Sequence, residues 1–251
     1  MARVRAILFI AFVAMVTVIF GALIALSLPF GGDGARNGAK AWNRTAFWGL
    51  RLIGGVTFRV ENPERLPEGG ALIAANHQSM WETMALYILL PRPAMIARKS
   101  LTKIPIFGWL LGPGGAILVD REGGAKAMRG LLREAQARVE KGEQVIVFPE
   151  GTRVPTGQTR PFKPGVAGIC AAIKAPCTPI AHNSGAFWPH RALALYPGQI
   201  TLRVLPAIEP GKDRNAFLRT LEAAIINARP DLNPDQETKV PSSMQRTSDG
   251  G

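Results

Sequence analysis

The sequence has little of what marks several common protein classes. Only two cysteines, Cys170 and Cys177, occur in its 251 residues, which excludes a disulfide framework and favours a reduced, cytosol-facing domain. Either thiol is a possible nucleophile, although a small buried hydrophobe is the commoner role of such a cysteine. Zinc-finger spacings and aromatic RNA-binding signatures are absent. The G-x-S-x-G segment of many lipid hydrolases is absent as well.

Acidic residues are also scarce. The 18 Asp and Glu residues stand against 30 Lys and Arg residues and leave a net charge of +12, which favours nucleic acid, an anionic membrane or a phosphorylated substrate as a partner. Seven of the basic residues, against one acid, fall in the first 60 residues around an apolar segment. Because this arrangement is typical of membrane proteins, we expect an anionic membrane lipid as a partner, and no nucleic acid.

The apolar segment runs from Ala6 to Leu28 without a charged residue. At ~1.5 Å per residue, a helix of this length covers the ~30 Å hydrocarbon core of a bilayer. A secretory signal peptide is the alternative, but its apolar region is shorter and precedes a small-residue cleavage site. Basic residues are more numerous after the segment than before it, which predicts a cytoplasmic C-terminal side. We therefore expect residues 1–34 to anchor the chain in the inner (cytoplasmic) membrane, with the following domain in the cytoplasm.

Residues 35–55 predict an amphipathic helix. Its basic face contains Arg36, Lys40, Arg44 and Arg51, and its apolar face contains Trp42, Ala46, Leu50 and Ile53. This pattern suits a helix at the headgroup level of an anionic leaflet. Packing of the same helix on a folded domain is an alternative that the pattern leaves open.

Residues 56–229 alternate short apolar runs with helical patterns. The expected strands are 71–75, 94–97, 116–120, 144–148, 178–181 and 200–205, and the expected helices are 123–141, 164–175 and 213–228. The alternation predicts a single α/β domain with a largely parallel or mixed sheet flanked by helices. The polar residues 230–251 predict a disordered tail.

A histidine and a carboxylate follow the first expected strand. His77 can accept a proton near neutral pH, and Glu82 can reach its other ring nitrogen if the histidine lies in a turn and the acid in the first turn of a helix. This pair is the base and orienting acid of a catalytic triad, with a substrate hydroxyl in place of the serine. Ser79 and Glu82 also match a capping box, so a purely structural role is the alternative.

Further polar residues follow other expected strands. The segment 148–153 offers Glu150, Gly151 for close approach of backbone to a ligand, the hydroxyl of Thr152, and the planar guanidinium of Arg153. Arg98-Lys99 and Asp120-Arg121 end two more strands. Ligands of open α/β sheets bind at the carboxyl ends of the strands. Three basic strand ends beside a histidine and a carboxylate thus indicate a site for an anionic substrate, whereas each segment alone is compatible with an ordinary polar loop.

At these residues the chain resembles the 1-acyl-glycerol-3-phosphate acyltransferases of the glycerolipid acyltransferase family. The resemblance covers about residues 70–206. The matching motifs, in the family's order, are Asn76-His77 with Glu82; Lys99, Leu101, Ile104-Pro105-Ile106-Phe107-Gly108 and Leu118-Val119-Asp120-Arg121; Phe148 to Arg153 with Phe162-Lys163-Pro164-Gly165; and Ala175-Pro176-Cys177-Thr178-Pro179. Two positions depart from the family pattern: Glu82 replaces the usual Asp, and Leu118 replaces a Phe.

The resemblance implies transfer of an acyl group from acyl-CoA or acyl-carrier protein to the sn-2 hydroxyl of lysophosphatidic acid. His77 would be the general base and Glu82 its orienting acid. Lys99, Arg121 and Arg153 would hold the phosphate, and Glu150 and Gly151 would shape the glycerol end of the site. No metal or cofactor is expected. The alternatives are another lyso-lipid acceptor, such as lyso-ornithine lipid, or a lipid hydrolase or non-catalytic lipid-binding protein.

Overall fold

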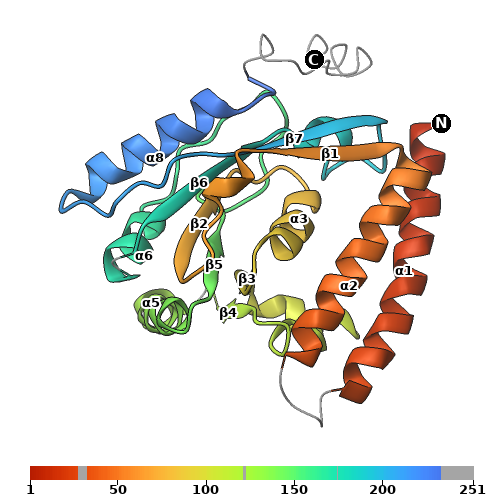
Figure 1. Cartoon of the computed structure of the whole chain (residues 1–251), viewed down its shortest axis with the longest axis horizontal. Helices are drawn as coiled ribbons and strands as arrows, with labels where there is room; N and C mark the ends of the chain where they lie inside the picture. Colours follow the sequence, from red (N-terminus) through yellow and green to blue (C-terminus); the bar gives the residue numbers. More distant parts are fainter. Residues whose placement is uncertain (28–32, 121–122, 174, 233–251) are drawn as a thin grey trace.

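The fold is a mixed sheet with helices on both faces (Figure 1). The computed structural model describes residues 1–27, 33–120, 123–173 and 175–232. Its strands are β1 Val56–Glu61, β2 Ala71–Ala75, β3 Pro93–Arg98, β4 Ile117–Val119, β5 Gln144–Val147, β6 Cys177–His182 and β7 Gly198–Val204. Its α-helices are α1 Ala2–Ser27, α2 Gly34–Gly49, α3 Trp81–Leu89, α4 Phe107–Leu111, α5 Gly124–Glu140, α6 Gly165–Ile173, α7 Ser184–Phe187 and α8 Arg214–Ala228. A π-helical turn, Leu50–Gly54, continues α2, and 3₁₀ turns occupy Pro63–Arg65 and Lys99–Lys103.

The seven strands lie in the order β1-β7-β6-β2-β5-β3-β4. Neighbours are parallel throughout, except that β7 runs antiparallel to β6. This confirms the single α/β domain that the sequence predicts. Sequence reasoning missed β1, because Thr57, Arg59 and Glu61 interrupt its apolar residues. Only its first residue is buried, as expected at the edge of a sheet, where one face and one side of a strand meet solvent.

The two faces of the sheet bury separate cores. Leu72 and Ala74 of β2 face a cluster with α5, α6 and α8, whereas Ile73 and Ala75 face a cluster that contains α3 and part of α1. Successive side chains of a strand point to opposite faces, and the central strands are therefore apolar at every position. Trp81, at the start of α3, is fully buried in the second cluster. The beginning of α3 is thus anchored in the core beside the carboxyl end of β2.

α1 and α2 form an antiparallel pair along one side of the domain (Figure 1). Gly38 and Gly49 of α2 let the helices approach, because a Cβ at either position would overlap Ile24 or Phe12 of α1. α1 also contacts the sheet domain at both ends. The carbonyl of Ala2 accepts a hydrogen bond of 3.1 Å from the Leu195 amide, and Gly21 packs on Ile106.

Two of the basic side chains of α2 contact the domain and are not left for a membrane. Arg36 is buried and donates a 2.9 Å hydrogen bond to Glu143, and Lys40 donates to the carbonyls of Leu90 and Pro91 at 2.9 and 2.7 Å. The expectation of a wholly interfacial basic face is therefore wrong for these two residues, because the buried acid Glu143 and the free carbonyls at the end of α3 require donors. Arg44 and Arg51 stay exposed, and these two are the basic residues of the predicted face that are left for lipid headgroups.

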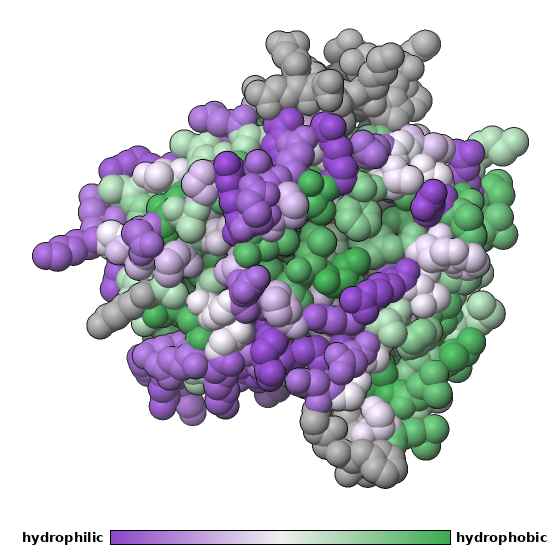
Figure 2. Space-filling model, in the orientation of Figure 1, coloured by the Kyte–Doolittle hydropathy of each residue, from purple (hydrophilic) through white to green (hydrophobic). Residues whose placement is uncertain are grey.

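α1 is long and apolar enough to cross a membrane, by length and composition alone. Among the residues that it exposes are Val4, Ile7, Leu8, Val18 and Leu23. The corresponding edge of the surface is largely hydrophobic in Figure 2, in contrast to the hydrophilic surface over α5. A membrane-associated α1 is consistent with this surface.

The first residues of the expected tail are packed on the domain. The side chain of Asp231 is fully buried and paired with Arg229 at 2.6 Å, so the packed domain extends at least to Asp231. The rest of the predicted tail, 233–251, lies outside the described residues, as do residues 28–32 of the predicted anchor.

Candidate active site

Five parallel strands end at one edge of the sheet. Because β6, β2, β5, β3 and β4 run parallel, the segments that follow them lie along that edge. The predicted convergence of residues 76–82, 148–153 and 98–99 on one rim follows from this topology. Arg121 lies outside the described residues, although Asp120 just before it follows β4 at the same edge.

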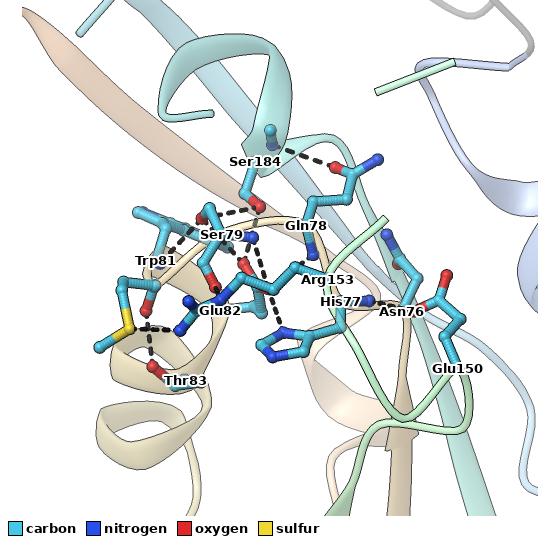
Figure 3. A network of polar contacts seen from close by, with 12 residues as sticks. Asn76, His77, Gln78, Ser79, Trp81, Glu82, Thr83, Glu150, Arg153 and Ser184 are labelled. Atoms are coloured by element: carbon cyan, nitrogen blue, oxygen red, sulfur yellow. Dashed lines mark hydrogen bonds and ion pairs between the residues drawn. The ribbon is translucent and has the colours of Figure 1, made fainter. Parts of the chain in front are cut away.

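His77 and Glu82 form the predicted pair (Figure 3). Nδ1 of His77 lies 2.7 Å from Oε1 of Glu82, and the imidazole stacks on Phe148 with ring centroids 4.1 Å apart. An ionised carboxylate only accepts hydrogen bonds, so Nδ1 carries the proton and Nε2 holds a lone pair. The His77 side chain is 15% exposed. Nε2 is thus the one ring nitrogen that is left to accept a proton from a substrate.

The carboxylate of Glu82 is fully buried and receives several donors. Oε1 accepts hydrogen bonds from His77 and from the amides of Gln78 and Ser79, both at 2.8 Å. Oε2 lies 3.0 Å from the Ser79 hydroxyl and 2.7 Å from the Ser184 hydroxyl. Among the described residues, each group that contacts the Glu82 oxygens can donate a hydrogen bond to them, and such bonds stabilise the ionised carboxylate.

These contacts decide the charge of Glu82. Burial alone would raise the pKa of Glu82, but the neighbouring His182 and the hydrogen bonds from His77 and Ser184 hold that pKa well below its usual range. Burial also lowers the pKa of His182, so this second imidazole is neutral near pH 7. At that pH we attribute the charged state of Glu82 to the hydrogen bonds.

The capping interpretation of this segment holds in part. Oγ of Ser79 accepts a 2.9 Å hydrogen bond from the Trp81 amide, and Glu82 accepts one from the Ser79 amide. In a capping box the serine hydroxyl accepts from the amide three residues on, whereas here the N-cap residue of α3 is Met80, which makes no side-chain cap hydrogen bond. Glu82 thus fixes the turn before α3 and holds His77 with the same oxygen.

The segment 148–153 fixes the backbone of His77. Oε2 of Glu150 accepts the His77 amide at 2.6 Å, and the His77 carbonyl accepts the Val154 amide at 2.7 Å. Glu150 is only 1% exposed, so it supports the base from behind and does not line an open glycerol site as expected. Burial, the largest influence, raises the pKa of Glu150 to about 8.

Several supporting residues escaped sequence reasoning. Asn76 clamps the ends of β2 and β6 together through two hydrogen bonds with the backbone of His182, at 2.9 and 3.0 Å. Gln78 donates to Asp231 at 2.8 Å, and Asp231 also accepts the Gly157 amide at 2.9 Å. The position of His182 and Ser184 just after a predicted strand was a usable signal. Asp231 offered none, because it lies 153 residues from Gln78.

The expected phosphate ligands differ in their surroundings. Nε of Arg153 donates to the Ser79 carbonyl at 3.1 Å, and the guanidinium lies against Met80, beside His77 in Figure 3. Thr152 is half-buried in the same loop. Gly151 has φ +69°, and a side chain there would press on Lys163, so this position needs glycine for its backbone. Lys99 is exposed at the end of β3.

Two cavities lie on either side of Met80. The first, about 150 Å³, is almost wholly apolar and extends from Met80 and Thr83 along α3 to Tyr87, with α1, α2 and α4 as its other walls. The second, about 270 Å³, is bounded by Arg153, by residues 188–195 and by the N-terminal half of α1. A long apolar chain fits the character of the first cavity, and a ligand with a polar end fits the second.

Comparisons with known proteins agree with this geometry. The Acyltransferase family model matches residues 57–183. The chain belongs to the acyltransferase family. It is 34% identical over 241 residues to the 1-acyl-sn-glycerol-3-phosphate acyltransferase of Pseudomonas aeruginosa, which covers 93% of each chain. It is 31% identical to the human 1-acyl-sn-glycerol-3-phosphate acyltransferase beta over 64% of this chain and 57% of the human one.

The fold has a counterpart among solved structures. The crystal structure of the 1-acyl-sn-glycerophosphate (LPA) acyltransferase of Thermotoga maritima aligns with a TM-score of 0.76 at 21% identity, over 92% of this chain and 97% of the other. At that identity the match establishes the shared fold. The family match and the Pseudomonas relative make this chain an O-acyltransferase, as the sequence predicted.

The first prediction concerns the charge of Glu82. Glu82→Gln keeps a side chain of the same size but removes the charge that stabilises a protonated His77, so kcat should fall on the order of 10²–10⁴-fold, as for His77→Ala. The variant should still fold, because Gln keeps an oxygen for the Gln78 and Ser79 amides and its NH2 group can donate to the Ser79 and Ser184 hydroxyls. Melting curves check that the loss of kcat is not a loss of fold. Glu134→Gln, an exposed carboxylate on α5, is the matched control. A Glu82→Gln enzyme with wild-type kcat would rule out the pair.

The second prediction concerns the pKa of Glu150. With a folded pKa of about 8 against an ordinary value of 4.5, the folded protein retains a proton that the unfolded chain has released. This contribution to stability therefore falls as pH rises from about 4.5 to about 8 and then levels off. Glu150→Gln keeps an acceptor for the His77 amide but cannot ionise. In melting curves from pH 5 to pH 9, the melting temperature of the variant should rise relative to that of the wild type as pH rises. A difference in melting temperature that does not change with pH would contradict the raised pKa of Glu150.

Proposed function

We propose that the protein transfers a fatty acyl group from a thioester donor to the sn-2 hydroxyl of 1-acyl-glycerol-3-phosphate, giving phosphatidic acid for phospholipid biosynthesis. The observation that carries the proposal is the His77–Glu82 contact of 2.7 Å, which prepares a base, and among the described residues the nearby Ser79 and Ser184 hydroxyls bond to Glu82 and not to the His77 ring. The names of the Pseudomonas and human relatives support the acceptor. The donor is acyl-CoA or acyl-carrier protein.

The chemistry needs only a base and its orienting acid. Nε2 of His77 takes the proton of the acceptor hydroxyl as the oxygen attacks the thioester carbonyl. Glu82 stabilises the imidazolium through Nδ1, as the acid of a catalytic triad does. The tetrahedral intermediate then collapses, the carbon–sulfur bond breaks, and His77 returns its proton to the thiolate. The step draws on no metal or cofactor.

The first cavity is suited to the acyl chain of the donor. Met80 and Thr83, which line it, flank Glu82 at the start of α3. At the far end, the Tyr87 hydroxyl donates a 2.5 Å hydrogen bond to the Gly114 carbonyl, which closes the wall. A chain in this cavity places its thioester at the end nearest His77.

The phosphate of the acceptor needs cations next to the base. Arg153 fits best, because its guanidinium is held between Ser79 and Met80 while its other N–H groups stay available. Lys99 and Arg121 are proposed to supply further positive charge from neighbouring strand ends. A lyso-lipid without a phosphate would leave Arg153 without a counter-charge.

The third prediction identifies the acceptor. Purified protein in detergent, given a panel of lyso-lipids with acyl-CoA or acyl-carrier protein, should acylate 1-acyl-glycerol-3-phosphate fastest, with products read by mass. Arg153→Ala should raise KM for that acceptor about tenfold or more, since a charge-assisted hydrogen bond contributes ~1.5–3 kcal/mol. The donor KM should change less. Preference for lyso-ornithine lipid, or release of free fatty acid without acceptor, would overturn the proposed reaction.

We further propose that the enzyme works on the cytoplasmic face of the inner membrane with α1 as its attachment. Because α1 contacts the domain both at Ala2 and at Gly21, the domain lies beside the helix along most of its length. This arrangement favours α1 within one leaflet over a separate membrane-crossing anchor.

The fourth prediction tests that placement. Single cysteines introduced for labelling at exposed Val4 near one end of α1 and at exposed Leu26 near the other should react with a membrane-impermeant reagent from the cytoplasmic side alone, or from neither side. Buried Cys170 and Cys177 should stay unlabelled in the parent protein. Labelling of one position from the cytoplasm and the other from the periplasm would show that α1 crosses the bilayer, as the sequence alone predicted.

A further inference from the structure

The second cavity is not used by the base, by the orienting acid or by the acyl chain of the donor. Its volume is about 270 Å³, and apart from Met80 and Arg153 its walls come from parts of the chain that the predicted motifs do not include. One wall is the N-terminal half of α1, with Ala6, Phe9 and Ile10, and another is the segment 188–195. Arg153 connects this cavity to the catalytic centre.

Basic side chains gather on the polar side of this cavity. Arg153, His190 and Arg191 all line it. Burial and the positive charges of Arg153 and Arg191 lower the pKa of His190, and the nearby His77 lowers it further. No salt bridge joins Arg153 or Arg191 to an acid among the described residues. The positive charges of Arg153 and Arg191 repel each other across the cavity, so an anion bound there would be stabilised by both, and the imidazole of His190 can donate an N–H group to it.

The other side of the cavity is apolar and leads to the lipid-facing surface of α1. Phe9 and Trp188 form its inner wall, with their rings in edge-to-face contact at 5.2 Å. Ile10 and Leu193 lie at its rim and are 52% and 50% exposed. A ligand that matches this cavity carries an anionic group at one end and an alkyl chain at the other.

We infer that this cavity binds the lyso-lipid acceptor, with Arg191 and His190 joining Arg153 around its phosphate and its sn-1 chain leaving past Ile10 and Leu193. The inference rests on the proposed function and adds specificity-determining residues to it. The acceptor's phosphate and its reacting hydroxyl are on adjacent carbons of glycerol, so the phosphate must bind close to His77. The phosphates of the donor are separated from its thioester by the pantetheine arm and do not have to lie there.

Arg191 provides the sharpest test, because it is exposed and makes no described contact with the catalytic pair. In mixed micelles without other anionic lipid, Arg191→Gln should raise KM for 1-acyl-glycerol-3-phosphate roughly tenfold, the effect of losing one charge-assisted hydrogen bond. kcat and the donor KM should stay near the wild-type values, and Arg191→Lys should recover part of the loss. Arg133→Gln, an exposed arginine on α5, is the matched control.

A binding measurement separates this inference from the proposed reaction. Titration calorimetry of 1-acyl-glycerol-3-phosphate into the inactive His77→Ala protein should show weaker binding when Arg191→Gln is added, whatever product the wild type makes. An unchanged Kd and acceptor KM would overturn the inference and leave the reaction standing. A rise in the donor KM alone would overturn it too, and would assign Arg191 to a donor phosphate. A loss confined to vesicles of anionic phospholipid, with normal kinetics in micelles, would assign Arg191 to bulk membrane headgroups and equally overturn it.

Discussion

The buried carboxylate of Glu82 is the constraint on which the catalytic geometry depends. A charge removed from water is stable only when its hydrogen-bonding capacity is filled, and here the donors come from the turn between β2 and α3 and from Ser184 after β6. Filling that requirement fixes the turn, orients the imidazole and determines its tautomer in one arrangement. The base is therefore in position before any substrate arrives, and little reorganisation is left for the reaction itself.

A second set of contacts secures the same turn from the opposite side. The amide and the carbonyl of His77 are both hydrogen-bonded to the loop after β5, while Gln78 reaches Asp231 near the end of the described chain. Hydrogen bonds thus join motifs that lie far apart in the sequence into one site. This explains why Glu150, in the middle of that loop, serves the base from a buried position, whereas Arg153 is the residue of the loop that we propose to contact the substrate.

The sequence predicts much of this because its strongest signals are local. Apolar runs identify six of the seven strands, and the parallel topology that they imply brings His77, Glu150 and Lys99 to one edge. What the sequence could not supply are contacts decided by tertiary packing. The use of Arg36 and Lys40 depends on where Glu143 and the end of α3 lie, and the role of Asp231 depends on a partner 153 residues away. Neither leaves a periodic pattern. A pattern also cannot say that one carboxylate both fixes a turn and orients a histidine.

The N-terminal helix forms a wall of both cavities. Thr17 and Phe20 of α1 line the first cavity, and Ala6 and Phe9 line the second, with Met80 on the wall of each. The exposed face of the same helix forms a largely apolar edge of the surface in Figure 2. Under the proposed function two alkyl chains have to reach one base, and a helix that only tethered the domain would have no reason to line both cavities. If α1 lies in the membrane as we propose, its depth there sets the height at which the lyso-lipid enters, and membrane attachment is coupled directly to substrate access.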